Sequence, residues 1–339
     1  MLNIRFSEFR QISLQISSYL IINHKQVALL TLLTCLLLAT VLFHTRSEGT
    51  NELGTREGGQ FNFVAAGDFG CNSDTNNTVA AMVKKNPEIV LALGDLSYER
   101  SPNCWLDVIS PLDSSGKVNI AFGDHDMTNE LFKYNTYLKH FNLTKPYYSF
   151  NYHNVHFLAM ATAKNKILPY VVNSQQYEFV RNDLKQAREN KSIDWIIVYS
   201  FKPFYSSNST HPGEEELRDF YHPLFDAYDV DLVLQAHNHN YQRTYPITFN
   251  NPSPSRPIIS DKQIHNFTNP KAPIFVTVGT GGAPLYNFSS QSPIVITQLA
   301  QYGFLNVDIE KFQNGDNLTG TFYKNNNLTK LDYFTITKR

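Results

Sequence analysis

Three apolar runs, FNFVAAGD (61–68), EIVLALGD (88–95) and KVNIAFGD (117–124), end in the same Gly-Asp dipeptide. Continuous apolar runs of this length are typical of strands that are buried on both faces of a sheet. Their final residues, Asp68, Asp95 and Asp124, are 27 and 29 positions apart, which is close to the length of one strand-helix-strand unit. The repeated ending therefore predicts parallel strands whose carboxyl ends lie at the same edge of a sheet.

The rest of the chain extends this pattern into an α/β (α+β) fold. Further apolar runs end at residues 201, 237 and 279, and segments 75–87, 175–190 and 216–228 have the apolar spacing of helices. Segment 147–162 has a polar centre at 151–154 and predicts a hairpin, while 303–337 predicts several antiparallel strands. We expect one domain of mixed sheet with helices on both sides, beginning near Phe61 and without internal repeats.

The composition excludes one class of partner. The chain has 339 residues, is 42% hydrophobic and carries a formal net charge of −1 from 29 basic and 30 acidic residues. This hydrophobic content suits a packed core. Because there is no overall positive charge, we expect no nucleic-acid partner. The oligomeric state is not indicated by the sequence.

The N-terminal region predicts a membrane anchor. Residues 27–43 are 17 consecutive uncharged, mainly apolar positions, and Arg5, Arg10 and Lys25 precede them. No small-x-small cleavage site follows, so we expect an uncleaved transmembrane signal anchor at 27–43 with residues 1–26 in the cytoplasm. Residues 44–60 are polar and Gly-rich and predict a flexible tether to an extracellular domain at 61–339. A removed signal peptide and a buried core helix are the alternatives.

Two other features agree with export. The chain has N-x-S/T sequons, which mark exposed loops when they are glycosylated. They begin at Asn76, Asn142, Asn190, Asn208, Asn266, Asn287, Asn317 and Asn327. Of three cysteines, Cys35 lies in the apolar run, which leaves Cys71 and Cys104 as one pair for an oxidising compartment or as two unrelated thiols.

Polar residues at the predicted strand ends form a candidate metal site. Ligands of open α/β sheets bind outside the carboxyl ends of the strands, where distant segments converge. Carboxylates gathered there would repel one another without a cation, and a mixture of oxygen and imidazole donors suits first-row transition metals. The candidate residues are Asp68, Asp95, Tyr98, Asp124, His125, Asp126, His237 and His239.

Four motifs, in this order, resemble a known family. GDFG (67–70), GDLSYE (94–99), GDHD (123–126) and HNHNYQR (237–243) are similar to the motifs of the calcineurin-like metallophosphoesterases, in particular of the purple acid phosphatase branch. The resemblance covers residues 61–339, including TVGTGG (277–282). It implies two packed mixed β-sheets flanked by helices, a four-layer sandwich, with a dinuclear metal centre at the strand ends.

The resemblance also implies a ligand set. Asp68, Tyr98 and His239 would bind the first metal, Asp95 would bridge, and His237 would bind the second. Gly70 supports this branch, because related phosphoesterases have a histidine ligand at that position. A phenolate from Tyr98 favours Fe³⁺, which leaves the second site for divalent Fe, Zn or Mn.

Three further residues are implied to act on the substrate, a small phosphate ester. His125 corresponds to the histidine that contacts the phosphate and assists the leaving group, and His211 resembles a loop histidine near the substrate. Asp126 is expected to orient His125 from behind. The reaction implied is metal-assisted hydrolysis by an activated water.

Two positions depart from the family pattern. Asp124 stands where the family has an asparagine ligand, and Phe201, after the apolar run 194–201, stands where it has a histidine. Asp124 can still ligate, and its added charge is expected to offset part of the loss, but Phe201 cannot ligate. The main prediction is an outward-facing, membrane-anchored acid phosphatase that hydrolyses phosphate monoesters. The alternatives are a catalytically impaired binding domain and a phosphodiesterase.

Overall fold

Two β-sheets form the centre of the fold in the computed structural model, which describes residues 60–113, 116–127, 131–163, 169–313 and 315–339. The predicted cytoplasmic segment 1–26, anchor 27–43 and nearly all of the tether 44–60 lie outside these residues. Within the described part of the chain, no helix is long and apolar enough to cross a membrane. The described residues belong to one unit, Arg56–Arg339.

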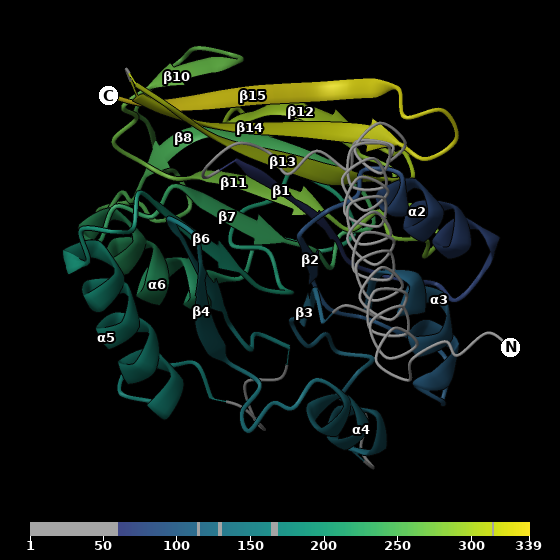
Figure 1. Ribbon diagram of the computed structural model, residues 1–339. Coiled ribbons are helices and arrows are strands. Elements are labelled where there is room, and N and C mark those ends of the chain that lie inside the picture. The colour runs from purple at the N-terminus through teal and green to yellow at the C-terminus, as the bar shows by residue number, and fades with distance from the viewer. Residues whose placement is uncertain (1–59, 114–115, 128–130, 164–168, 314) are drawn as a thin grey trace, which may run out of the picture. The chain divides into compact units, whose positions relative to one another are not determined.

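The elements follow the order expected for a mixed α/β domain (Figure 1). The strands are β1 Phe61–Ala66, β2 Ile89–Ala92, β3 Val118–Ile120, β4 Tyr148–Tyr152, β5 Val155–Ala159, β6 Trp195–Tyr199, β7 Leu232–Gln235, β8 Tyr241–Thr248, β9 Ile258–Ile259, β10 Asn266–Thr268, β11 Ile274–Val278, β12 Val295–Leu299, β13 Gly303–Phe312, β14 Gly315–Lys324 and β15 Lys330–Lys338. The helices are α2 Ser73–Val83, α3 Asn103–Asp113, α4 Phe132–His140, α5 Gln175–Glu189 and α6 Glu215–Ala227.

The strands form two mixed sheets. Sheet A has the order β10-β15-β14-β13-β1-β2-β3, and sheet B has the order β12-β8-β11-β7-β6-β5-β4 with β9 beside β8. Strands β1, β2 and β3 are parallel, as are β5, β6, β7 and β11. The predicted mixture of parallel and antiparallel strands is confirmed, including the hairpin β4-β5 and the antiparallel set β13-β14-β15.

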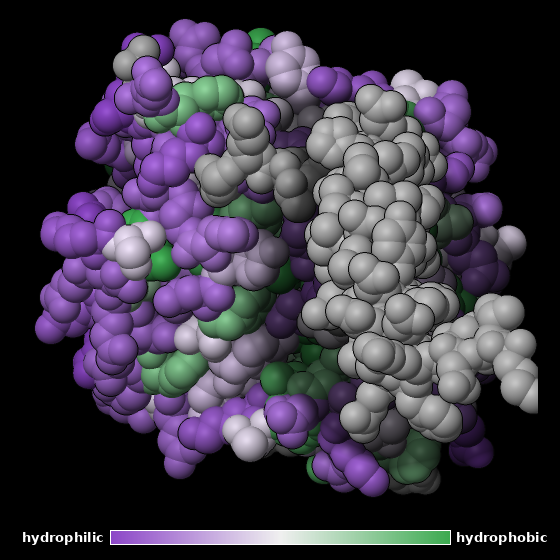
Figure 2. Space-filling model, viewed as in Figure 1, coloured by the Kyte–Doolittle hydropathy of each residue, from purple (hydrophilic) through white to green (hydrophobic). Residues whose placement is uncertain are grey.

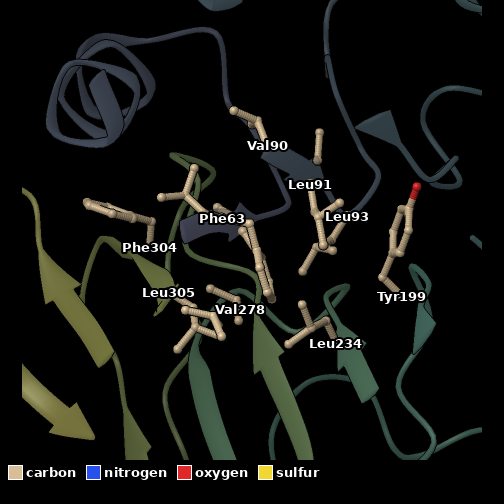
Figure 3. Close-up of a cluster of buried hydrophobic side chains, with 14 of the residues drawn as sticks. Phe63, Val90, Leu91, Leu93, Tyr199, Leu234, Val278, Phe304 and Leu305 are labelled. Carbon is tan, nitrogen blue, oxygen red and sulfur yellow. The ribbon is translucent and has the colours of Figure 1, made fainter. Parts of the chain in front are cut away.

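The main core lies between the two sheets. Figure 3 shows Phe63 of β1 and Leu93, just after β2, projecting toward Leu234 of β7 and Val278 of β11. All four side chains are fully buried. Each of these strands comes from an apolar run that predicts a strand buried on both faces of the sheet. Burial of apolar area therefore accounts for the packing of the two sheets.

Helices cover the outer faces of the sheets. Figure 1 shows α2 and α3 beside sheet A and α5 and α6 beside sheet B. Val180 of α5 and Phe225 of α6 are fully buried and belong to a second apolar cluster with Val198 of β6. Helix α5 begins where Ser174 accepts a hydrogen bond from the Tyr177 backbone N–H at 3.1 Å, a favourable N-cap.

A polar contact also joins the two sheets, and the face of the domain drawn in Figure 2 is mostly polar. The Tyr148 hydroxyl of β4 lies 2.9 Å from both the backbone N and the carbonyl O of Ile120 on β3, and 3.0 Å from the Tyr199 hydroxyl. On the face drawn in Figure 2, the described residues are mostly hydrophilic and the apolar ones form small separate areas. The apolar residues of the fold are therefore used mainly in its interior.

Candidate metal centre

The candidate residues lie where strands end in sharp, left-handed backbone turns. Asp68 after β1, Asp95 after β2 and His237 after β7 have φ angles of 59°, 46° and 68°. Non-glycine residues adopt such angles at a cost and often do so at functional sites. The turn after β1 is fixed by the Asp68 backbone N–H, which donates to the Gly94 carbonyl at 3.0 Å. The ends of neighbouring parallel strands are thereby tied together.

Asp68, Tyr98 and His239 form one hydrogen-bonded cluster. The Tyr98 hydroxyl lies 3.2 Å from Asp68 Oδ1 and 2.8 Å from His239 Nε2, and Asp68 Oδ1 lies 3.5 Å from His239 Nε2. The other Asp68 oxygen, Oδ2, accepts a hydrogen bond from the His237 backbone N–H at 2.9 Å. The three residues that the sequence assigns to the first metal are therefore brought together from three separate strand ends.

The orientation of His239 is fixed from outside the cluster. Its Nδ1 lies 2.8 Å from the Pro284 carbonyl, which can only accept, so Nδ1 carries the proton and Nε2 presents its lone pair to the cluster. The ring of Tyr286 stacks on that of His239 with centroids 4.0 Å apart. A histidine held by a carbonyl in this way is oriented as metal-ligating histidines are.

Asp95 lies close to the turn that follows β3. Its Oδ1 accepts a hydrogen bond from the His125 backbone N–H at 2.8 Å. A Cβ atom at Gly123 would lie 2.1 Å from the Asp95 backbone N and 2.2 Å from Asp95 Oδ1, so only glycine fits there. The His125 ring is exposed, with its centroid 4.3 Å from that of Tyr98, so it is reachable from solvent beside the cluster.

Asp126 holds two of the site loops together. Its fully buried carboxylate accepts hydrogen bonds from the backbone N–H groups of Leu96, at 2.9 Å, and Gly123, at 2.8 Å. These bonds connect the loop after β2 to the turn after β3. This role of Asp126 was not anticipated from the sequence, and its expected orientation of the His125 ring stays a prediction.

His211 joins the site from a loop between β6 and α6. Its ring stacks on that of His237, with centroids 3.8 Å apart and planes 22° from parallel. Asn238, between the two histidines of the HNH motif, is fully buried. Its Oδ1 accepts a hydrogen bond from the His211 backbone N–H at 3.0 Å, and its Nδ2 donates to the His211 carbonyl at 2.7 Å. The expectation that His211 lies near the site residues agrees with this contact.

Phe201 fills the space beside His237. Its side chain is fully buried, and its ring centroid lies 4.7 Å from that of His237. A Cβ atom at Gly94 would lie 2.7 Å from Phe201 Cδ2, which shows how closely the ring packs against the loop that carries Asp95. An apolar ring without donor atoms therefore packs beside His237, at the position where the resemblance implies an imidazole.

The electrostatics of the cluster favour neutral forms in the absence of a cation. Burial raises the pKa of Asp68 to about 8 and that of Asp95 well above its usual range, and the negative charge of Asp124 adds to both shifts. Burial also lowers the pKa of His239 to about 4 and that of His237 to about 3. Buried acids with raised pKa values and unprotonated imidazoles together make a site where a cation would relieve the desolvation cost.

The donors fit a first metal ion better than a second. Among the described residues, no three or more His, Cys, Asp or Glu side chains are grouped so as to hold a metal ion. The first cluster instead combines one carboxylate, one imidazole and the Tyr98 phenol, with Asp95 close enough for its charge to act on Tyr98. Beside His237 lie the ring of Phe201, which has no donor atom, and the ring of His211.

Two residues of the site were missed by sequence reasoning. Tyr286 follows the TVGTGG segment and covers His239, and Asn238 fixes the loop of His211. The only sequence signal for Asn238 is its place between two candidate ligands. No spacing or charge pattern singles out Tyr286 among the 19 tyrosines of the chain.

The comparisons with known proteins agree with this geometry. The family model for the calcineurin-like phosphoesterases matches residues 61–241. Purple acid phosphatase 21 of Arabidopsis thaliana is 28% identical over 240 residues, which cover 65% of this chain and 49% of the relative. The chain thus spans about half the length of the curated relatives it matches.

Two solved structures share the fold. The structure of purple acid phosphatase PPD1 from yellow lupin (Lupinus luteus) seeds has a TM-score of 0.69 at 23% identity, covering 83% of this chain and 54% of that one. GAP50, the anchor in the inner membrane complex of Plasmodium, has a TM-score of 0.63 at 16% identity, covering 83% and 90%. Because the family model covers more than half of the chain, including the strand ends that carry Asp68, Asp95 and His239, the chain belongs to the calcineurin-like phosphoesterase family.

Proposed function

We propose that this chain is a metal-dependent phosphoric ester hydrolase of the purple acid phosphatase type, acting on phosphate monoesters. The observation that carries the proposal is the cluster of Asp68, Tyr98 and His239, in which an oxygen, a phenol and an oriented imidazole converge from three strand ends. The curated relatives are phosphatases by name, which supports the same reaction class.

The residues divide into metal holders and substrate contacts. Asp68, Tyr98 and His239 would hold an iron ion. Asp95 would contribute to both metal positions, and His237 and Asp124 would hold a divalent ion. The chemistry supplied by metal ions at such a centre is Lewis-acid activation of a phosphate ester and of a water molecule.

His125 and His211 would contact the phosphate. The His125 ring is exposed beside Tyr98, and its backbone N–H is held by Asp95, so the ring is positioned to donate a proton to a leaving oxygen. His211 is held by Asn238 through two backbone hydrogen bonds and presents its ring against His237.

The cellular location is proposed from the sequence, with support from surface features. We place the catalytic domain outside the cell behind a single N-terminal anchor. Cys71 and Cys104 form a disulfide, which suits an oxidising compartment. The sequon asparagines at 76, 142, 190, 208, 266, 287 and 327 are exposed, whereas Asn317 is half-buried and accepts a hydrogen bond from Thr337.

The test combines metal content with turnover in the purified full-length chain. We expect bound iron, a visible tyrosinate-to-iron absorption band that disappears in Tyr98→Phe, and hydrolysis of an aryl phosphate monoester with a maximum at acidic pH. Tyr286→Phe is a matched control, because it removes a neighbouring phenol that is not among the proposed ligands. Absence of both metal binding and hydrolysis after loading with iron and zinc would reject the proposal.

A second candidate function follows from Phe201. The Phe201 ring packs where a histidine ligand of a second metal ion would stand. The competing proposal is therefore that the domain binds another molecule without catalysing a reaction. GAP50, a structural neighbour, is described as an anchor in a membrane complex. A chain that binds one metal ion or none and hydrolyses neither monoesters nor diesters, while remaining folded, would favour this binding role.

A further inference from the structure

A buried lysine lies behind the candidate metal centre and has no part in the ligand set. Lys133, on α4, is only 2% exposed, and its Nζ donates a hydrogen bond to the Ser97 carbonyl at 2.5 Å. A lysine is rarely buried to this extent, because removing an ammonium group from water is costly unless it is paired. Burial lowers the pKa of this ammonium group, and the nearby Asp126 and Asp95 counter only part of that shift.

The carbonyl that Lys133 holds belongs to the residue before Tyr98. Ser97 is itself fully buried, and its hydroxyl accepts a hydrogen bond from the Glu99 backbone N–H at 3.1 Å. The same hydroxyl lies 3.2 Å from Cys104 Sγ of the disulfide. On the other side, the Leu96 backbone N–H donates to Asp126 at 2.9 Å. The segment 96–99 is thus fastened on both sides of Tyr98.

Tyr98 needs this support because its hydroxyl must meet two partners at once. The hydroxyl lies 3.2 Å from Asp68 Oδ1 and 2.8 Å from His239 Nε2, and these two atoms belong to loops after β1 and β7. Tyr98 itself lies in no helix or strand, so the hydrogen-bond ladder of a sheet does not fix its backbone. Anchoring of a ligand's backbone by neighbouring groups is the usual way in which such a site is made rigid.

We propose that Lys133 is a positioning residue, which sets the place of the Tyr98 phenol in the metal centre by holding the Ser97 carbonyl. The inference deepens the proposed function and rests on it for the role of Tyr98 as a ligand. Lys133 would act without touching metal or substrate. A purely structural role, in which Lys133 only compensates the charge of Asp126, would stabilise the fold without a specific effect on Tyr98.

The experiment compares Lys133→Met with Lys139→Met in the full-length chain. Methionine keeps the apolar stem of the lysine and removes the charge and the donors, and Lys139 is an exposed lysine on the same helix. In metal-free protein, we expect faster amide hydrogen exchange in the peptide covering 94–99 for Lys133→Met only. Unchanged exchange in that peptide would overturn the proposal.

Metal affinity gives the second readout, measured with Co²⁺ in competition with a chelator. We expect Lys133→Met to weaken binding by about tenfold, as for other residues that support a ligand. In a Tyr98→Phe background, Lys133→Met should not weaken Co²⁺ binding further, because the phenol through which Lys133 acts is absent. If the losses of Co²⁺ affinity in Lys133→Met and Tyr98→Phe simply add in the double variant, Lys133 has a structural role and the positioning role is rejected.

The experiment distinguishes failure of the proposed function from failure of the proposal for Lys133. If the unmodified chain binds no Co²⁺, the proposed function fails, while the exchange comparison still decides whether Lys133 fixes the Tyr98 segment. If Lys133→Met does not fold, Lys133→Gln, which keeps an N–H donor but not the charge, takes its place. Exchange at 94–99 as slow as in the unmodified chain would support the donor role of residue 133, and fast exchange would contradict it.

Discussion

The ring of Phe201 lies against that of His237, with centroids 4.7 Å apart, and both follow parallel strands of sheet B that are neighbours. The contact joins a candidate ligand to a side chain that has no donor atom. The proposed second metal position would therefore lack a donor on the side of His237 that Phe201 covers.

Replacement of Phe201 by histidine is expected to increase the number of bound metal ions per chain. The new imidazole would stand beside His237, in the volume that the phenyl ring now fills, and would supply the missing nitrogen donor. Metal content after loading with zinc and dialysis measures the effect. Phe201→Leu is the matched control, because it removes the ring without adding a ligand. An equal metal content in both variants would contradict the prediction.

Reduction of the disulfide is expected to lower the stability of the domain. Cys71 and Cys104 are separated by 33 positions, and a crosslink over a loop of this size contributes about 3 to 4 kcal/mol through the unfolded state. The free energy of unfolding in urea, with and without a reducing agent, measures this contribution. A Cys71→Ser, Cys104→Ser double variant should be insensitive to the reductant, and an unchanged midpoint for the unmodified chain would refute the expected role.

The disulfide is also expected to support the first metal position. Cys71 lies three residues after Asp68, and Cys104 Sγ lies 3.2 Å from the hydroxyl of Ser97, which precedes Tyr98. Reduction should therefore weaken Co²⁺ binding under conditions where the protein remains folded. Circular dichroism and chelator competition on the same sample separate loss of affinity from unfolding. Full affinity in the reduced, folded protein would confine the disulfide to a stabilising role.

The turn after β3 is expected to tolerate no side chain at Gly123. A Cβ atom there would lie 2.2 Å from Asp95 Oδ1, so Gly123→Ala should displace Asp95 and weaken metal binding. Gly116→Ala serves as the control. Its Cβ would meet nothing within 4 Å, and its φ of 67° should cost only about 1 to 2 kcal/mol of stability. Equal metal affinity in the two variants would argue against the close approach of Gly123 to Asp95.

A buried ion pair between β8 and β15 is expected to be needed for stability. Arg243 donates to Asp332 through Nε at 2.6 Å and Nη2 at 2.8 Å, and the Tyr241 hydroxyl donates to the same carboxylate at 2.8 Å. Asp332→Asn should cost about 3 to 5 kcal/mol in the free energy of unfolding, because it leaves the Arg243 charge buried without a counter-charge.

The control for this pair is the double variant Arg243→Met, Asp332→Leu. An apolar replacement of both partners removes the unpaired charge, so it should recover much of the stability lost in Asp332→Asn. Urea unfolding of the three proteins gives the comparison. If the double variant were less stable than Asp332→Asn, the pair would contribute more than charge compensation.

The strands and helices were predictable where the local sequence has a clear apolar pattern. Apolar runs that end in Gly-Asp mark β1 and β2, because a buried strand must end where a charged residue begins. Helices α3 and α4 were not predicted. The segment of α3 has Pro111 inside it, and α4 begins after Leu131, which has a left-handed φ of 49° and no capping side chain. Packing decides α4, whereas the buried residues of α3, which are Trp105, Ile109 and Leu112, have the i, i+4, i+7 spacing of a helix that sequence reasoning missed.

The site was predictable only for residues inside motifs. Asp68, Tyr98 and His239 were found by their place at strand ends and by family resemblance, and their proximity agrees with the predicted ligand set. Tyr286 contacts His239, and Lys133 contacts Ser97. These partners are far away in the chain, so no spacing pattern in the sequence predicts the contacts. The disulfide was one of two readings of Cys71 and Cys104, because its formation depends on how α3 packs beside the loop after β1.

The position of β1 inside sheet A has a consequence for how the protein is made. Strand β1 has β2 on one side and β13 on the other, with Phe61 opposite Ile309, 248 positions later. At roughly 5 to 20 residues per second, a ribosome needs about 10 to 50 s to complete that distance. During this interval one edge of the first strand has no native neighbour, and such edges promote aggregation. The yield of the domain should therefore depend on chaperones that shield the nascent chain until its last third has been synthesised.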